Sequence, residues 1–150
     1  MDDQELRAAV TSAIGQPDLL RLFDYWLERC KGGRLPARRD IDPLELPYII
    51  GNLVLVDVER DPLRFRYRLT GSNLTMQFKL NLTGRLVDEH PDPTMRRLAN
   101  EAYTKVVTTG RPLAYRRDMI IDKTVRRYDV LVLPLAGDGT TIDKILAGMK

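Results

Sequence analysis

The sequence predicts an α+β domain in which a five-stranded antiparallel sheet carries helices on one face and a helical extension at its N-terminus. Three observations predict this class. Helical periodicity fills the first third of the chain, two strand-like runs follow it, and a long amphipathic helix then precedes three more strand-like runs. The 150 residues fit a single domain. We therefore expect an N-terminal helical extension over residues 1–50 and a sheet domain over residues 51–148.

The composition excludes several classes of protein. Hydrophobic residues make up 43% and charged residues 30% of the chain, with a net charge of +3, which is unlike a disordered chain. No apolar run reaches the roughly 18–20 residues that cross a bilayer, and the acidic N-terminus is unlike a signal peptide. Cys30 is the single cysteine, so we expect no internal disulfide and a reducing compartment. The expected location is the cytoplasm, with no membrane contact.

Two helices are expected in the first third. Asp2 or Asp3 can cap the first, and Gly15 ends it. Pro17 begins the second, and the Gly32-Gly33 pair follows its end. The apolar face of the first helix consists of Leu6, Ala9, Val10, Ala13 and Ile14.

The next segment has strand character. Leu53–Val58 is β-branched and apolar, and Arg64–Thr70 alternates strictly, so the two runs predict an antiparallel hairpin with a turn over residues 60–62. A strand exposes alternate residues to opposite faces. The alternation therefore places Phe65, Tyr67 and Leu69 on one face and Arg64, Arg66 and Arg68 on the other.

The rest of the chain completes the sheet. Short helices are expected over Leu74–Phe78 and near Val87, and Asp92-Pro93 starts a long helix that Gly110 ends. The remaining strands are expected over Leu113–Ile121, Val125–Leu135 and Ile142–Ala147. The second face of the sheet needs a cover, which the N-terminal helices or a second subunit can supply.

This order of elements resembles that of a PAS domain, and four local motifs strengthen the resemblance. They are Tyr25-Trp26, Gly33-Arg34-x-Pro36-x-Arg38-x-Asp40-Ile41-x-Pro43, the strand Phe65–Gly71, and Leu82-Thr83-Gly84-Arg85. From about Leu20 to about Leu146 the chain resembles a bacterial subfamily of short, largely stand-alone PAS-like proteins. The resemblance implies a PAS-like sheet and a sensory or regulatory module in signal transduction. It carries over no established ligand and no catalytic residue.

A PAS domain usually holds its pocket between the inner face of the sheet and the short and long helices. On this mapping the ligand-binding candidates are Tyr67, Leu69, Met76, Phe78, Met95, Ala99, Tyr103 and Met119. Methionines and tyrosines suit an adaptable apolar pocket with a few polar groups. The alternative interpretation is that these residues only form the core.

The sequence leaves the cofactor unknown. A flavin adduct or a covalent chromophore needs a thiol near the central helices, but Cys30 lies upstream of the sheet. His90 is the single histidine, and it precedes Pro91 outside the long helix, which argues against haem ligation. No metal site or catalytic group is predicted, because no cluster of ligands and no nucleophile beside a histidine occurs.

The basic segment around Arg34, Arg38 and Asp40 allows two interpretations. It can bind an anion or a partner, since guanidinium groups pair with carboxylates and phosphates, or it can clamp the N-terminal helices to the sheet. We favour the clamp. The row of Arg64, Arg66 and Arg68 lacks any nucleic-acid-binding motif, so no nucleic-acid partner is expected.

We therefore expect a non-catalytic module that binds a small apolar ligand, a protein partner such as a kinase or regulator, or both. A ligand would shift how the N-terminal helices pack on the sheet, with Trp26 as their anchor. One alternative is a small enzyme or carrier using Tyr67, Tyr103, Asp88 or His90, and another is a pure interaction domain. We expect a homodimer through the first helix, because its apolar stripe otherwise lacks a partner.

Overall fold

The computed structural model describes residues 2–150 and contains four α-helices, five strands and four short 3-10 helices within that range. The helices are α1 (Asp3–Ala13), α2 (Pro17–Arg29), α3 (Ser72–Phe78) and α4 (Pro93–Thr109). The strands are β1 (Leu53–Glu59), β2 (Arg64–Thr70), β3 (Leu113–Ile121), β4 (Thr124–Leu135) and β5 (Lys144–Met149). The 3-10 helices are η1 (Arg38–Asp40), η2 (Pro43–Glu45), η3 (Ile50–Asn52) and η4 (Val87–Glu89).

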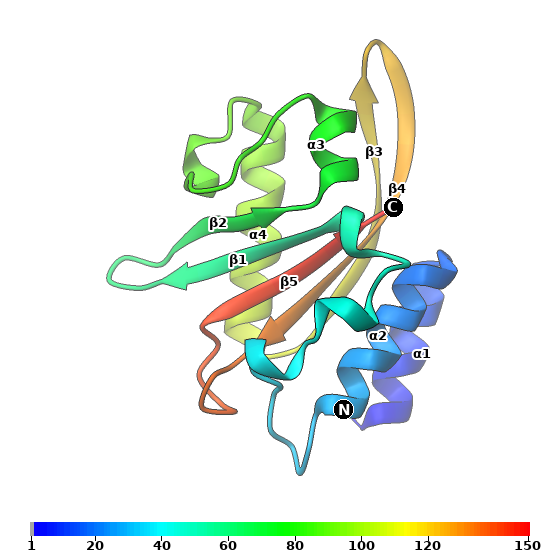
Figure 1. Cartoon of the computed structure of the whole chain (residues 1–150), viewed down its shortest axis with the longest axis vertical. Coiled ribbons are helices and arrows are strands. Elements are labelled where there is room, and N and C mark those ends of the chain that lie inside the picture. The colour runs from blue at the N-terminus through cyan, green and yellow to red at the C-terminus, as the bar shows by residue number, and fades with distance from the viewer. Residues whose placement is uncertain (1) are drawn as a thin grey trace.

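The five strands form one antiparallel sheet, which confirms the predicted fold class (Figure 1). Its strand order is β2-β1-β5-β4-β3, so the last strand in sequence lies at the centre and the two hairpins lie outside it. The β3–β4 hairpin projects beyond the other strands at the top of the view, close to α3. The sheet therefore offers two long faces that must both be covered.

Both faces are covered by helices of the chain itself. Helix α4 packs on one face, whereas α1, α2 and the loop after them pack on the other. Strand β4 supplies both sides, because every residue from 128 to 135 is buried. Val130 and Val132 belong to the core under α4, which we call the inner core, and Leu131 and Leu133 belong to the core under α2, the outer core.

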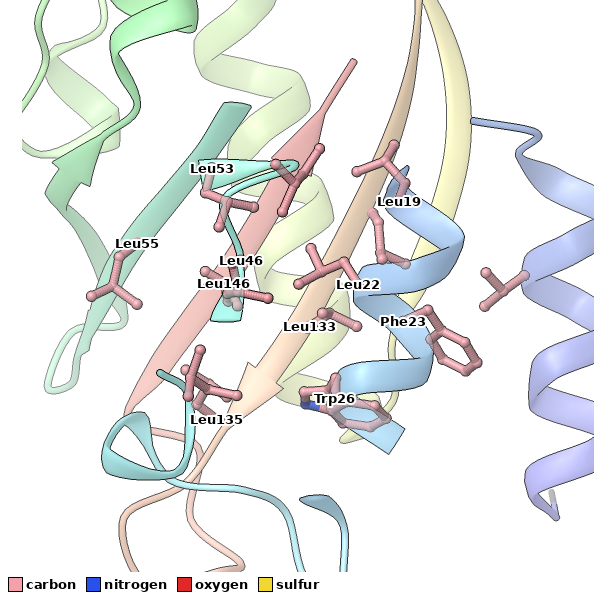
Figure 2. Close-up of a cluster of buried hydrophobic side chains, with 14 of the residues drawn as sticks. Leu19, Leu22, Phe23, Trp26, Leu46, Leu53, Leu55, Leu133, Leu135 and Leu146 are labelled. Carbon is pink, nitrogen blue, oxygen red and sulfur yellow. The ribbon is translucent and has the colours of Figure 1, made fainter. Parts of the chain in front are cut away.

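Figure 2 shows the outer core, in which α2 lies along the leucines of the sheet. Leu19, Leu22, Phe23 and Trp26 repeat at helical spacing, so they occupy one face of α2 and are all fully or almost fully buried. Across from them stand Leu53, Leu55, Leu133, Leu135 and Leu146. The N-terminal segment thus gives the second sheet face the cover that the sequence required.

The apolar stripe of α1 also finds its partner within the chain. Val10 and Ile14 are buried, and Leu6 and Ala13 pack at the edge of the outer core. Asp2 caps the helix by accepting from the backbone N–H of Glu5, as the sequence predicted. The stripe of α1 is therefore covered without a second copy of the chain, and it gives no reason to expect a dimer through this helix.

One expected face assignment is wrong. Leu55 pairs with Leu69 and the next residue, Val56, pairs with Tyr67, so Arg68 is an extra residue on β2. Such a bulge reverses the alternation beyond it. Tyr67 therefore faces α4, whereas Leu69 lies on the opposite face and is 55% exposed.

A buried carboxylate fastens the turn between α1 and α2 to the sheet. Asp129 of β4 accepts from the backbone N–H groups of Gly15 and Gln16 at 2.8 and 2.9 Å, and from Arg116 Nε of β3 at 3.0 Å. Burial alone would raise the pKa of Asp129. The two backbone donors and the Arg116 guanidinium outweigh that effect and lower the pKa below its ordinary value.

Replacing Asp129 with Asn should destabilise the fold by about 1–3 kcal/mol at pH 7, because the charged acceptor is lost. A carboxyl group whose pKa is lowered on folding contributes stability above its unfolded pKa of about 4, and this contribution is lost as the pH falls through the folded pKa. The difference in unfolding free energy between wild type and Asp129→Asn should therefore shrink below about pH 4. Urea unfolding followed by circular dichroism at several pH values measures it.

Asp118→Asn is the matched control, because Asp118 pairs with Arg127 at the exposed surface. It should cost at most about 1 kcal/mol. Equal effects of the two substitutions at pH 7 would contradict the fastening role of Asp129.

Candidate functional site

A cavity of about 560 Å³ lies between the inner face of the sheet and the helices α3 and α4. This volume is typical of small-molecule sites. Its walls carry mostly apolar side chains. Those of the sheet include Val54, Tyr67, Thr70, Tyr115, Arg117, Met119, Val130, Val132 and Ala147, and those of the helices and loops include Leu74, Phe78, Leu80, Leu82, His90, Met95, Ala99 and Tyr103.

Packing in the inner core positions the walls of the cavity. Tyr103 of α4 meets the edge of the Phe65 ring of β2, with ring centroids 5.5 Å apart. Helix α3 is held to the sheet by Tyr128 of β4, whose hydroxyl donates to Gln77 Oε1 at 2.7 Å. Two sides of the cavity thus depend on contacts between elements far apart in sequence.

Six of the eight residues that the sequence singled out line this cavity: Tyr67, Phe78, Met95, Ala99, Tyr103 and Met119. The other two do not. The bulge turns Leu69 to the opposite face of the sheet. Met76 lies on the outer side of the short helix α3 and is 75% exposed. A seven-residue helix with one packed face leaves such a residue in solvent.

The wall also holds polar residues outside the eight ligand-binding candidates, among them Tyr115, Arg117 and His90; of these, the sequence indicated only His90, and only for the enzyme alternative. Tyr115, Arg117 and Met119 alternate along β3, so they share one face. Extending the period of two back from Met119 would have found the other two. His90 carries no such signal, because it lies in a loop before α4.

Burial sets the protonation of the polar wall. It raises the pKa of Tyr67 to about 12 against the opposing effect of Arg117, and it raises the pKa of Tyr103 well above the ordinary value. Burial lowers the pKa of His90, and Arg96 and Arg117 lower it further against the opposing effect of Asp92. At neutral pH the tyrosines are hydroxyl donors and the imidazole is uncharged.

His90 is already engaged on one side. Its Nδ1 accepts from the backbone N–H of Asp92 at 3.0 Å. Within residues 2–150, no three histidine, cysteine or acidic side chains come together as a metal-ligand set. Cys30 lies at the end of α2 against the outer core, and burial and the nearby Asp3 raise the pKa of its thiol to about 11. The cavity wall therefore contains no thiol.

The basic loop after α2 joins the N-terminal segment to the turn between β4 and β5. Arg34 Nη2 donates to the carbonyl of Asp138, and the backbone N–H of Leu35 donates to the carbonyl of Gly139 at 2.9 Å. Asp40 accepts from the backbone N–H of Ala37 at 2.9 Å, which closes η1. Arg34 and Leu35 thus join the loop to the β4–β5 turn, whereas the carboxylate of Asp40 bonds only within the loop.

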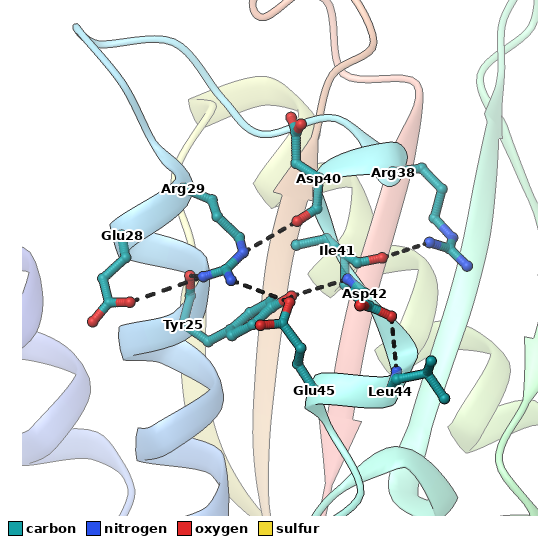
Figure 3. Close-up of polar contacts among 9 residues, drawn as sticks. All are labelled: Tyr25, Glu28, Arg29, Arg38, Asp40, Ile41, Asp42, Leu44 and Glu45. Atoms are coloured by element: carbon teal, nitrogen blue, oxygen red, sulfur yellow. Dashed lines mark hydrogen bonds and ion pairs between the residues drawn. The ribbon is translucent and has the colours of Figure 1, made fainter.

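Figure 3 shows how α2 holds the same loop. Arg29 lies over the Tyr25 ring at 3.3 Å and donates through Nε to the carbonyl of Asp40 at 3.1 Å. The Tyr25 hydroxyl donates to Glu45 Oε1 and accepts from the backbone N–H of Asp42, each at 2.9 Å. Arg38 donates only locally in this view, to the carbonyl of Ile41 at 2.9 Å.

A second hollow, of about 250 Å³, lies on the outer face between η2, η3 and the edge of the sheet. Leu46, Leu53, Leu55 and Leu69 line it, and Arg38 stands at its wall. Leu69 therefore belongs to this hollow.

The arginine row of β2 is largely neutralised. Arg66 pairs with Glu59 at 2.7 Å and Arg68 pairs with Asp57 at 3.5 Å. Lys144 of β5 approaches the same Asp57 at 2.8 Å. The surface of this edge is a mixed-charge network and offers no continuous basic face for phosphates.

Trp26 attaches α2 to the centre of the sheet. It is 2% exposed, and its indole Nε1–H donates to the carbonyl of Pro134 at 2.9 Å. Val132 is the last residue of β4 that pairs with β3, so Pro134 lies beyond the β3–β4 ladder. Its carbonyl accepts the hydrogen bond of the Trp26 indole where a neighbouring strand would otherwise donate one. Phe23 stacks beside the indole at 6.1 Å.

Comparison with known proteins places this geometry. The sequence profile of a family described as PAS domain matches residues 15–150. The structure of the PAS domain from Bordetella pertussis BvgS is similar, with a TM-score of 0.54 and 15% identity over 86% of this chain and 84% of that one. No curated protein sequence matches the chain.

Two further solved structures are similar at lower scores. The PAS domain of a protein from Colwellia psychrerythraea has a TM-score of 0.49 and 10% identity over 73% of this chain and 96% of that one. The PAS domain of histidine kinase ThkA has a TM-score of 0.47 and 14% identity over 65% of this chain and 97% of that one.

Across residues 2–150, no helix has the length and apolar character that crossing a membrane requires.

The indole bond of Trp26 generates a stability prediction. Trp26→Phe keeps an aromatic ring in the outer core but leaves the Pro134 carbonyl without a donor, and it should lower the unfolding free energy by about 1–3 kcal/mol. Trp26→Ala adds a cavity and should cost about 3–5 kcal/mol. Because Trp26 is the only tryptophan, far-ultraviolet circular dichroism in urea is the appropriate measurement.

Tyr25→Phe provides the comparison, since it removes a hydroxyl from an exposed network on the same helix. It should cost less than Trp26→Phe. A Trp26→Ala variant as stable as wild type would refute the anchoring role.

Proposed function

The chain belongs to the PAS domain family, and we propose that it is a non-catalytic sensory module that binds a small, largely apolar ligand between its sheet and α3 and α4. PAS domains are sensory modules of signal transduction. The single observation that carries this proposal is the cavity of about 560 Å³ in the inner core. Well-packed interiors hold few voids larger than a water molecule, so an apolar space of this size favours an occupant.

The proposed signal passes through the sheet to the N-terminal helices. Val130 and Arg117 face the cavity, while the adjacent residues Asp129 and Arg116 face the other side and hold the turn at Gly15. A ligand that moves β3 or β4 directly changes the geometry of the hydrogen bonds by which Asp129 holds this turn. The ligand then acts by favouring one packing of α1 and α2 over another.

The N-terminal helices are the output surface in this proposal. They would contact a protein partner, such as a kinase or regulator, or a second copy of the chain. Leu44 is 88% exposed on the loop that joins these helices to the sheet, next to the apolar hollow of the outer face. Exposed apolar residues of this kind are typical of contact surfaces.

A second candidate function, a small enzyme, is favoured by His90 in the cavity wall. General acid–base catalysis needs a group whose pKa lies near the working pH and whose acceptor atom reaches the substrate. The backbone N–H of Asp92 occupies Nδ1 of His90, and burial raises the pKa of both tyrosines beyond that range. These features support the sensory role over the catalytic one.

Native mass spectrometry of protein purified without added ligand tests the proposal. We expect an additional mass corresponding to one small molecule per chain. Ala99→Leu places a larger side chain into the cavity and should weaken retention about tenfold or more, because overpacking costs roughly 1–3 kcal/mol.

Ala8→Leu is the matched control, since Ala8 is an exposed residue of α1. It should retain the molecule as wild type does. A clean apo mass for the wild-type chain would contradict ligand sensing and favour the interaction domain.

A further inference from the structure

Arg117 is the least satisfied charged group of the cavity. Its Nη2 donates to the thioether sulfur of Met95 at 2.7 Å, and a thioether is a weak acceptor. Its Nε is buried and finds no acceptor within residues 2–150. A buried donor without a partner costs about 1–3 kcal/mol. The guanidinium therefore lacks the strong acceptor that would compensate its position.

Two neighbouring arginines of the same hairpin differ from Arg117 in this respect. Arg116 pairs with Asp129, and Arg127 pairs with Asp118, each at 3.0 Å. Arg117 lies between these pairs in the strand register, opposite Tyr128. No carboxylate forms an ion pair with it in the part of the chain that the structure describes.

The two carboxylates of the cavity wall are already engaged. Asp92 caps α4 by accepting from the backbone N–H of Thr94 at 2.9 Å. Asp122 pairs with Lys79 at 3.5 Å across the exposed rim between β3 and α3. The charge of Arg117 is therefore not neutralised by the protein, and the cavity wall presents a positive group to whatever occupies it.

Other unused polar groups surround the same space. Thr70 Oγ1 is the second buried polar side-chain atom without a partner in residues 2–150, and Thr70 also lines the cavity. The hydroxyls of Tyr67 and Tyr103 make no hydrogen bond to the described residues, and their raised pKa values keep them protonated. The Arg117 cation and the hydroxyls of Thr70, Tyr67 and Tyr103 thus stand in a mainly apolar wall.

We propose that the ligand of this cavity is an apolar acid whose carboxylate pairs with Arg117 while its hydrocarbon or aromatic body fills the space between α4 and the sheet. A guanidinium and a carboxylate match each other in geometry and charge. The tyrosine hydroxyls can donate to the same carboxylate. The apolar walls at Met95, Ala99 and Met119 take the body. This inference rests on the proposed ligand-sensing function and names the ligand class.

The test compares octanoate with 1-octanol by isothermal titration calorimetry on the full chain after removal of any retained molecule. The two probes share a hydrocarbon body and differ in the charged group. Wild type should bind octanoate about ten- to a hundredfold more tightly than octanol, as expected for hydrogen bonds to a charged group. Arg117→Gln should abolish that preference and leave octanol binding unchanged.

Arg127→Gln is the matched control, because it removes the same charge from the adjacent strand outside the cavity. It should keep the full preference for octanoate. Arg117→Lys should keep part of the preference, since it retains the charge but loses the planar fork. Without ligand, the melting temperature of Arg117→Gln should be no lower than that of wild type, because the variant lacks the uncompensated cation. If Arg117 had a purely structural role, the substitution would lower the melting temperature.

The outcomes separate the two proposals. Equal binding of octanoate and octanol by wild type, or a preference that survives in Arg117→Gln, overturns the acid ligand and leaves ligand sensing standing. Binding of neither probe overturns the acid ligand, and a clean apo mass for the wild-type chain then overturns ligand sensing as well.

Discussion

The structure depends on one constraint, which is that its single sheet must bury both faces. Strand β4 lies inside the sheet, is buried on both sides from residue 128 to residue 135, and is apolar on both sides from residue 130 onward. A sheet with only α4 on it would expose Leu131 and Leu133 to water, at a cost of about 1.5–3 kcal/mol for each side chain. Helices α1 and α2 remove that cost, and Asp129 and Trp26 secure them to the strand that requires them.

The same strand therefore connects two chemically different sides. Toward α4 the sheet leaves a cavity, and toward α2 it is closely packed. Residues that touch the cavity alternate with residues that hold the N-terminal turn, as Arg117 does with Arg116 and Val130 with Asp129. Contacts that position the helices therefore lie one residue away from residues that line the cavity. This arrangement fits the proposed signal, because densely packed interiors transmit strain.

Much of the fold was predictable because its signals are local. Asp92 and Pro93 start α4, and Gly110 ends it in a left-handed conformation, each by its own backbone chemistry. Hydrophobic period then located Met95, Ala99 and Tyr103 on one face of that helix. Leu69 was misplaced because a bulge at Arg68 follows from the pairing of two strands, which alternation along one strand cannot reveal.

The sequence by itself determined the strands, the helices, their capping and most of the apolar lining of the cavity, since these follow from periodicity and from residues within a few positions of one another. Only the tertiary structure decided that α1 and α2 cover the second face of the sheet, which arginines form ion pairs with a carboxylate, and that His90 lies in the cavity wall. Pairing of Arg116 with Asp129, and its absence at Arg117, depends on which side chains two strands bring opposite each other. Charge balance is a property of that three-dimensional neighbourhood, because electrostatic attraction acts over distances in space regardless of distance along the chain.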